Sequence, residues 1–145
     1  MDTWLLFIYK VPNEPSARRV YVWRKLKAMG AIVLHDSVWV LPLNARTREK
    51  LQWLAGEVNE LPGGEAMLWE AKQIFTGQEG DLIGQFVIQV DTLYKDILVQ
   101  LQRKNPDLAG LSRQYQLANA QDYFQSELGK EVYEKLLELR RKGES

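Results

Sequence analysis

Residues 16–41 read SARRVYVWRKLKAMGAIVLHDSVWVL, and within this stretch the sequence changes from a helical to a β pattern. At 100° per residue, one apolar helix face collects Val22, Trp23, Leu26 and Met29. Ser16 is a candidate N-cap for this helix, and Gly30 is the residue after its last turn that ends the helix. Two short β-rich runs, 31–34 and 38–41, come next and predict a hairpin.

The flanking sequence extends this stretch into the order strand, helix, strand, strand, helix, strand. Trp4–Tyr9 is a continuous apolar run, typical of a central strand covered on both faces. Asn44 is a candidate cap for a second helix, and Glu65–Ile74 predicts the last strand. The apolar stripe of the second helix is Leu51, Leu54, Ala55, Val58 and Leu61. This order is typical of the ferredoxin-like βαββαβ fold, an α+β architecture with an antiparallel sheet and both helices on one face.

The rest of the chain has helical periodicity only. A long amphipathic helix of roughly 20 residues is predicted by Ile83, Phe86, Val90, Leu93, Ile97 and Leu101. Asn105-Pro106 predicts the start of another helix, and Ser126 is a candidate cap for a third. The stripes of these two are Leu108, Leu111, Tyr115 and Ala118, then Leu128, Val132, Leu136 and Leu139. We therefore expect a ferredoxin-like domain over 1–76 and a two- to three-helix extension over 77–145 packed on it.

Composition excludes several classes of chemistry. The chain has 145 residues, of which 46% are hydrophobic, and it contains no cysteine and one histidine. Disulfides, thiolate metal sites and cysteine nucleophiles are therefore excluded, as is a metal cage built from histidines. The N-terminal apolar run is too short for a signal peptide or a membrane span, so we expect a cytoplasmic protein without a membrane partner.

The formal net charge is zero, with 19 basic and 19 acidic residues, but the two signs are unevenly placed. Residues 1–50 hold nine basic and four acidic residues, whereas residues 51–145 hold ten and fifteen. This split favours a basic working surface on an acidic scaffold. An uneven distribution of ordinary solvated charge explains the counts equally well.

The first helix carries the strongest functional pattern. Its polar side presents cations and one ring, a set suited to phosphates and a stacked base: Arg18, Tyr21, Arg24, Lys25 and Lys27. Arg19 falls by phase within the apolar face, where it either reaches a carboxylate such as Glu70 or is held ready for an anion. Three further cations open the second helix: Arg46, Arg48 and Lys50. They either extend the basic surface or form an ordinary solvated helix face.

No catalytic or cofactor motif stands out. His35 lies beside Asp36 and Ser37, but in a predicted hairpin a lone histidine is more typical of a surface residue than of a catalytic triad. We expect no catalytic residue, no metal site and no cofactor. We expect most of the following tryptophans to pack in the core and not to line a binding groove: Trp23, Trp39, Trp53 and Trp69.

Several motifs resemble the N-terminal region of the ChrB family, the chromate-responsive regulators linked to chromate-efflux genes. They are WLLFIYKVP at 4–12, EPSARRV at 14–20, WRKLK at 23–27, GA at 30–31, VWVLP at 38–42, GEA at 64–66 and DYF at 122–124. More distantly, the module resembles that of PaaX repressors and of small CRISPR-associated nucleases. Those nucleases place a metal-binding aspartate at the end of the first strand, where this chain has Tyr9-Lys10. Because a lysine repels Mg²⁺, the nuclease interpretation is weak.

The resemblance implies a binding and regulatory protein of bacterial chromate, or oxyanion, resistance that is not an enzyme. Its expected partners are duplex DNA or an oxyanion, and a second copy of the chain in a homodimer. The expected binding residues are Lys10, Arg18, Arg19, Tyr21, Arg24, Lys25 and Lys27. The alternatives are a metal-dependent nucleic-acid phosphodiesterase of the CRISPR-associated type and a non-catalytic dimerisation scaffold.

Overall fold

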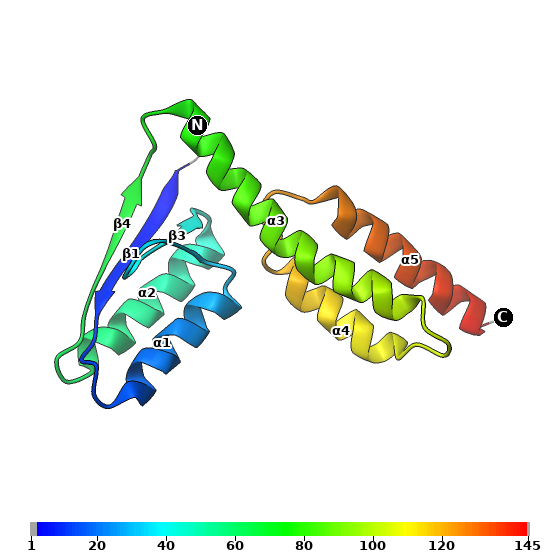
Figure 1. The fold of residues 1–145 in the computed structure, drawn as a ribbon, viewed down its shortest axis with the longest axis horizontal. Coiled ribbons are helices and arrows are strands. Elements are labelled where there is room, and N and C mark those ends of the chain that lie inside the picture. The colour runs from blue at the N-terminus through cyan, green and yellow to red at the C-terminus, as the bar shows by residue number, and fades with distance from the viewer. Residues whose placement is uncertain (1–2, 145) are drawn as a thin grey trace. The chain divides into compact units, whose positions relative to one another are not determined.

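The first unit of the fold, residues 1–79, alternates strands and helices in the predicted order (Figure 1). A computed structural model describes residues 3–144. The elements of this unit are β1 (Trp4–Lys10), α1 (Ser16–Ala28), β2 (Ile32–His35), β3 (Val38–Pro42), α2 (Ala45–Glu60) and β4 (Glu65–Ala71). The last strand is three residues shorter than predicted.

The four strands form one antiparallel sheet in the order β2-β3-β1-β4, so β1 is central as predicted. Both helices lie on one face of the sheet (Figure 1). Phe7 pairs with Trp39, and Leu5 pairs with Leu41. Opposite residues share a face of a sheet, and these four are at most 4% exposed. The core of this unit is completed by Val22, Leu26, Leu51, Leu54 and Val58.

The second face of the sheet is not fully covered, contrary to the prediction for β1. Leu6 and Ile8 alternate with the buried residues and are only partly buried. Their partners on β4, Trp69 and Met67, are about half exposed.

The ends of α1 and α2 show why these helices stop where they do. Gly30 has φ 79°, a left-handed conformation that glycine adopts without strain. Its N–H bonds the carbonyl of Lys27, and the N–H of Ala31 bonds that of Leu26, which is a Schellman motif. Ser16 is the first helical residue rather than the cap, because Pro15 occupies the N-cap. The predicted cap of α2 is confirmed by a reciprocal capping box between Asn44 and Thr47.

Side chains from α2 also cover the free edge of the sheet at β4. The side chain of Asn59 accepts a hydrogen bond from the N–H of Ala66 (2.8 Å) and donates one to its carbonyl (3.4 Å). Arg48 forms an ion pair with Glu70 at 3.1 Å. Unpaired strand edges are sites of unwanted pairing, and Asn59 occupies both backbone groups of one edge residue.

The second unit, residues 80–145, is helical. Its elements are α3 (Thr76–Leu101), which begins in the first unit, α4 (Leu108–Asn119) and α5 (Glu127–Glu144). α3 starts before Gly77 and Gly80, which the sequence places ahead of the helix. The buried side chains of the helical core are Val90, Tyr94, Ile97, Leu101, Leu111, Ala118, Val132 and Leu136.

Two details of this unit differ from the sequence interpretation. Tyr94 is buried in place of Leu93, which is 39% exposed, because both are apolar neighbours and only one can face inward. Asp107 rather than Asn105 caps α4, by accepting a hydrogen bond from the N–H of Gly110. The cap of α5 is confirmed, since the Ser126 hydroxyl accepts the N–H of Leu128 at 3.1 Å.

A polar cluster ties the start of α5 to α3. The hydroxyl of Tyr94 donates to Asp122 at 2.9 Å, and the other oxygen of Asp122 accepts the N–H of Ser126. The hydroxyl of Ser126 donates to Asp91. A Cβ at Gly129 would lie 2.8 Å from the ring of Tyr94, so glycine is what allows this close approach.

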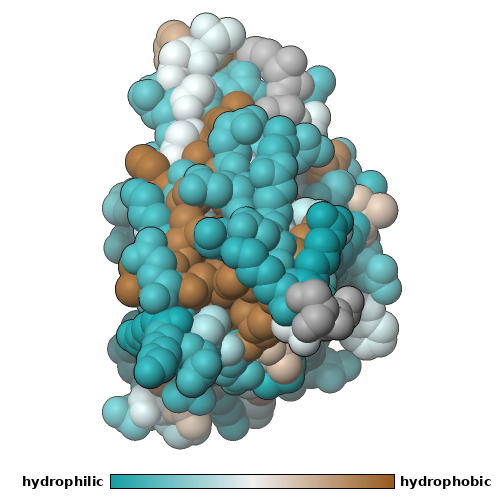
Figure 2. All heavy atoms as spheres, turned by 90° about the vertical axis from the view of Figure 1, so that its right-hand side faces the viewer, coloured by the Kyte–Doolittle hydropathy of each residue, from teal (hydrophilic) through white to brown (hydrophobic). Residues whose placement is uncertain are grey.

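Apolar side chains also reach the surface of the helical unit, where Ile88, Val99 and Leu117 are more than half exposed. Figure 2 shows apolar side chains among polar ones on the side that faces right in Figure 1. Within residues 3–144, no helix has the length and apolarity that crossing a membrane requires.

Candidate nucleic-acid and anion interface

Helix α1 carries five cations and no acidic residue. The first unit as a whole holds ten basic and nine acidic residues, so the charge split lies within this unit and not between the two units. Carboxylates gather instead at the end of α2 and on β4, as Glu57, Glu60, Glu65 and Glu70. Half of the cations of this unit therefore lie on one helix that has no acidic residue.

The structure reverses the predicted roles of the two neighbouring arginines. The buried stripe of α1 runs through Val22 and Leu26, which places Arg18 on its half-buried flank and Arg19 in solvent. Trp23, predicted on the buried face, is 51% exposed. Four consecutive apolar residues, 20–23, span most of a helical turn, so the pattern alone cannot decide which of them face inward.

Arg18 has a structural partner within the same unit. Its Nη1 donates a hydrogen bond to the carbonyl oxygen of Pro62 at 3.3 Å, which ties α1 to the turn after α2. Of the two alternatives for Arg19, the contact with Glu70 does not form, since Glu70 pairs with Arg48.

Arg19 lines a small pocket at the end of β1. The pocket has a volume of about 250 Å³ and is lined by Tyr9, Ser16, Arg19, Val20 and Trp23. Burial raises the pKa of Tyr9, while the neighbouring indole of Trp39 and the charge of Arg19 act in the opposite direction. The pocket thus brings together a guanidinium, a phenol and a serine hydroxyl, a set of donors suited to a small oxyanion.

Tyr21 is not a free stacking ring. Its hydroxyl donates a hydrogen bond to Glu57, and this bond raises the pKa of Tyr21. The ammonium of Lys25 lies over the same ring, 5.6 Å from its centroid. Tyr21 therefore links α1 to α2 and holds Lys25 beside the groove between them.

Arg24 and Lys27 form the outer surface of α1 and are exposed. Among the ion pairs within residues 3–144, none involves a cation of α1. Lys10 is also exposed, at the end of β1, where its partner across the sheet is Glu65. Arg24 and Lys27 are thus the cations of this set that have the freest approach to a polyanion.

The tryptophan prediction is wrong for three of the four positions. Trp39 is buried, but Trp23, Trp53 and Trp69 are 51%, 70% and 54% exposed. For Trp53 the sequence holds the correct signal, because the stripe of Leu51, Leu54 and Val58 leaves it on the opposite side of α2.

The hairpin residues around His35 form no triad. The His35 Nδ1 lies 3.5 Å from a carboxylate oxygen of Asp36, and both side chains are more than four-fifths exposed. The carbonyl of Ser37 accepts the N–H of Tyr9. Across the part of the chain that the structure describes, no three histidine, aspartate or glutamate side chains are grouped as metal ligands.

These observations define a class: an α+β protein with a four-stranded antiparallel sheet, one cationic helix on that sheet, and a C-terminal set of helices. The chain belongs to the ChrB N-terminal family, since its residues 19–141 match the family described as "Protein ChrB, N-terminal".

One curated relative is similar in sequence. It is Protein ChrB of Cupriavidus metallidurans, which is 37% identical over 65 residues. The matched stretch covers 45% of this chain and 20% of that protein, so the similarity spans about a fifth of the relative's length. No solved structure matches the chain.

Proposed function

We propose that this ChrB-family chain is a cytoplasmic binding and regulatory module of bacterial chromate resistance that contacts duplex DNA through α1. The observation that carries the proposal is the exposed, unpaired pair Arg24 and Lys27 on a helix without acidic residues. Cations that neutralise phosphates release condensed counterions, which supplies most of the affinity of such contacts. An α-helix also has the width that the major groove admits.

The architecture is compatible with the proposal, and one position at the end of β1 weighs against the nuclease alternative. Viewed from its other edge the strand order is β4-β1-β3-β2, which agrees with a ferredoxin-like assignment. Tyr9-Lys10 stands where the small CRISPR-associated nucleases, which the module distantly resembles, carry a metal-binding acid. The charge of Lys10 disfavours Mg²⁺ there. A homodimer would present two copies of α1 to two half-sites, as two-fold symmetry requires.

The test is a titration of a short labelled duplex with the full chain at several salt concentrations. We expect affinity to fall steeply as salt rises, with a slope set by the number of phosphate contacts. An affinity that does not change with salt contradicts the proposal. A parallel incubation of RNA and duplex DNA with Mg²⁺ tests the nuclease alternative, which requires strand cleavage.

An oxyanion is a second candidate ligand, favoured by the pocket of Arg19, Tyr9 and Ser16. A guanidinium and two hydroxyls match the oxygens of a tetrahedral anion such as chromate. Calorimetric titration with chromate and with sulfate tests this site. Loss of binding in Arg19→Ala, with binding retained in Arg24→Ala, would assign the anion to this pocket.

A further inference from the structure

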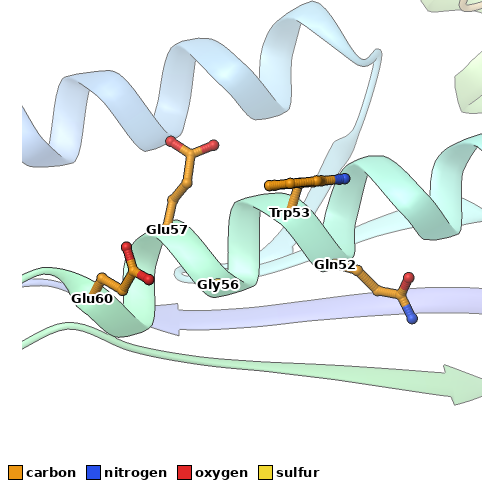
Figure 3. A pocket seen from close by; sticks show the side chains of 5 residues that line it. All are labelled: Gln52, Trp53, Gly56, Glu57 and Glu60. Atoms are coloured by element: carbon orange, nitrogen blue, oxygen red, sulfur yellow. The ribbon is translucent and has the colours of Figure 1, made fainter.

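Trp53 is an aromatic ring on the outside of the first unit, with its indole 70% exposed. It projects from α2 on the side of α1, together with Glu57, while Gln52 and Glu60 point elsewhere (Figure 3). Trp53 lines two grooves. The exposed indole is thus accessible to a flat ligand.

The groove between α1 and α2 combines cations with an apolar floor. It has a volume of about 340 Å³, within the usual range of small-ligand pockets. Lys25 from α1 and Lys50 from α2 line it, and its apolar lining is Ala28, Met29, Trp53 and Leu54. Burial lowers the pKa of Lys50, with a smaller contribution from the charge of Arg46. Two lysines therefore border an apolar surface that ends at an indole.

The one carboxylate that lines the groove beside these lysines is hydrogen-bonded to a tyrosine. Glu57 lines the same groove and accepts the hydroxyl of Tyr21. No ion pair within residues 3–144 involves Lys25 or Lys50. The two ammonium groups are therefore available to an anion from outside the chain.

The second groove that Trp53 lines differs in charge. It has a volume of about 370 Å³ and is lined by Gln52, Trp53, Gly56, Glu57 and Glu60, with no cation among them. A Cβ at Gly56 would meet nothing within 4 Å, so packing does not require a glycine in this groove. Glu57 lines both grooves, but the groove with Lys25 and Lys50 has two cations against this one carboxylate. A phosphate is therefore attracted to that groove and repelled from the one that holds Glu57 and Glu60.

We propose that this groove binds an unpaired nucleotide of single-stranded nucleic acid, with the base stacked on Trp53 and the phosphate held by Lys25 and Lys50. Aromatic rings beside basic grooves bind single strands in this way, because every base has a stacking face. The site extends the proposed function, because Lys25 lies on the same basic helix, but it does not use Arg24 or Lys27.

The experiment is a titration of the full chain against a labelled oligothymidylate, with AMP and a duplex of equal length as separate arms. Trp53→Ala is expected to weaken binding of the single strand by about 5- to 150-fold, the range for one stacked base. Lys25→Gln and Lys50→Gln should each lower the slope of log affinity against log salt by about 0.7, since each removes one phosphate contact. If AMP also binds and loses affinity in Trp53→Ala, the ligand of the groove is a free nucleotide and not a nucleotide within a strand.

Trp69→Ala is the matched control, because it removes a similarly exposed indole from β4. We expect it to bind the single strand as the unaltered chain does. The proposal is overturned if Trp53→Ala binds like the control, or if neither the oligothymidylate nor AMP binds. The duplex arm is independent: loss of duplex binding in Arg24→Ala, with single-strand binding intact, separates this site from the proposed function.

Discussion

The guanidinium of Arg18 lies 3.3 Å from the carbonyl oxygen of Pro62 and donates a hydrogen bond to it, whereas its neighbour Arg19 lines an open pocket together with Tyr9. Two consecutive arginines thus have different roles, because they point 100° apart around α1. One links elements of the fold, and the other is available to a ligand.

This difference predicts opposite effects of two alanine substitutions. Arg18→Ala should lower the free energy of unfolding by about 0.5–1.5 kcal/mol, because it removes a hydrogen bond between α1 and the turn after α2. Arg19→Ala should change it by no more than about 0.5 kcal/mol, as is usual at exposed positions. Urea unfolding followed by circular dichroism measures both. A larger loss in Arg19→Ala than in Arg18→Ala would show that the phase of α1 is wrong.

Arg24→Ala and Lys27→Ala test the outer surface of α1. Each should lower the slope of log affinity against log salt for duplex DNA by about 0.9, since each removes one phosphate contact. Arg113→Ala on α4 removes the same charge from an exposed site in the other unit and is the control. Equal slopes for all three variants would place the DNA contact elsewhere.

Two glycines, one within α2 and one in the first turn of α5, should respond in opposite ways to alanine. Gly56→Ala should raise the free energy of unfolding by up to about 1 kcal/mol, because alanine is the better helix former and its Cβ meets nothing within 4 Å. Gly129→Ala should lower it by about 1–3 kcal/mol, because the new Cβ would lie 2.8 Å from the ring of Tyr94 and 2.9 Å from Asp122. Thermal unfolding of the two variants side by side gives the comparison, and shifts of the same sign would refute it.

The polar cluster predicts a loss of stability at alkaline pH. Burial, together with the hydrogen bond to Asp122, raises the pKa of Tyr94 above that of an unfolded tyrosine, so the folded state keeps a proton that the unfolded state releases. This contribution to stability is complete below about pH 10 and is lost as the pH rises beyond it. Urea unfolding at neutral and alkaline pH measures the effect.

Tyr94→Phe is the matched variant for that measurement. It should be less stable at neutral pH by about 1–3 kcal/mol, because Asp122 loses a hydrogen-bond donor. It should also have a shallower alkaline decline than the unaltered chain. An identical decline in both proteins would assign the titration to other tyrosines.

The hydrogen bonds of Asn59 to the edge strand β4 should limit self-association of the chain. Asn59→Ala frees the N–H and the carbonyl of Ala66 on the edge of β4, and free edges favour pairing with another chain. We expect a loss of about 1 kcal/mol in stability and a larger sedimentation coefficient at high concentration. Gln52→Ala, at an exposed site on the same helix, should change neither quantity.

The sequence by itself determined the order of the elements. The apolar run of β1, the glycine after α1, the Asn44 cap and the Ser126 cap all act through local geometry, and the structure confirms each of them. The stripes of α2, α4 and α5 are confirmed as well, because each has apolar residues separated by three or four positions and so leaves one possible face.

Only the tertiary structure decided which face of α1 is buried and which of its cations remain free. Residues 20–23 are all apolar, so periodicity could not choose between Arg18 and Arg19. The packing of Val22 and Leu26 in the core decided it, and Arg18 then bonds the carbonyl of Pro62. The groove beside Trp53 likewise joins Lys25 and Lys50, which are 25 positions apart and adjacent only because both helices pack on one sheet. Local patterns specify elements since their causes lie within one turn or strand, whereas a site between elements depends on long-range packing that no single stretch encodes.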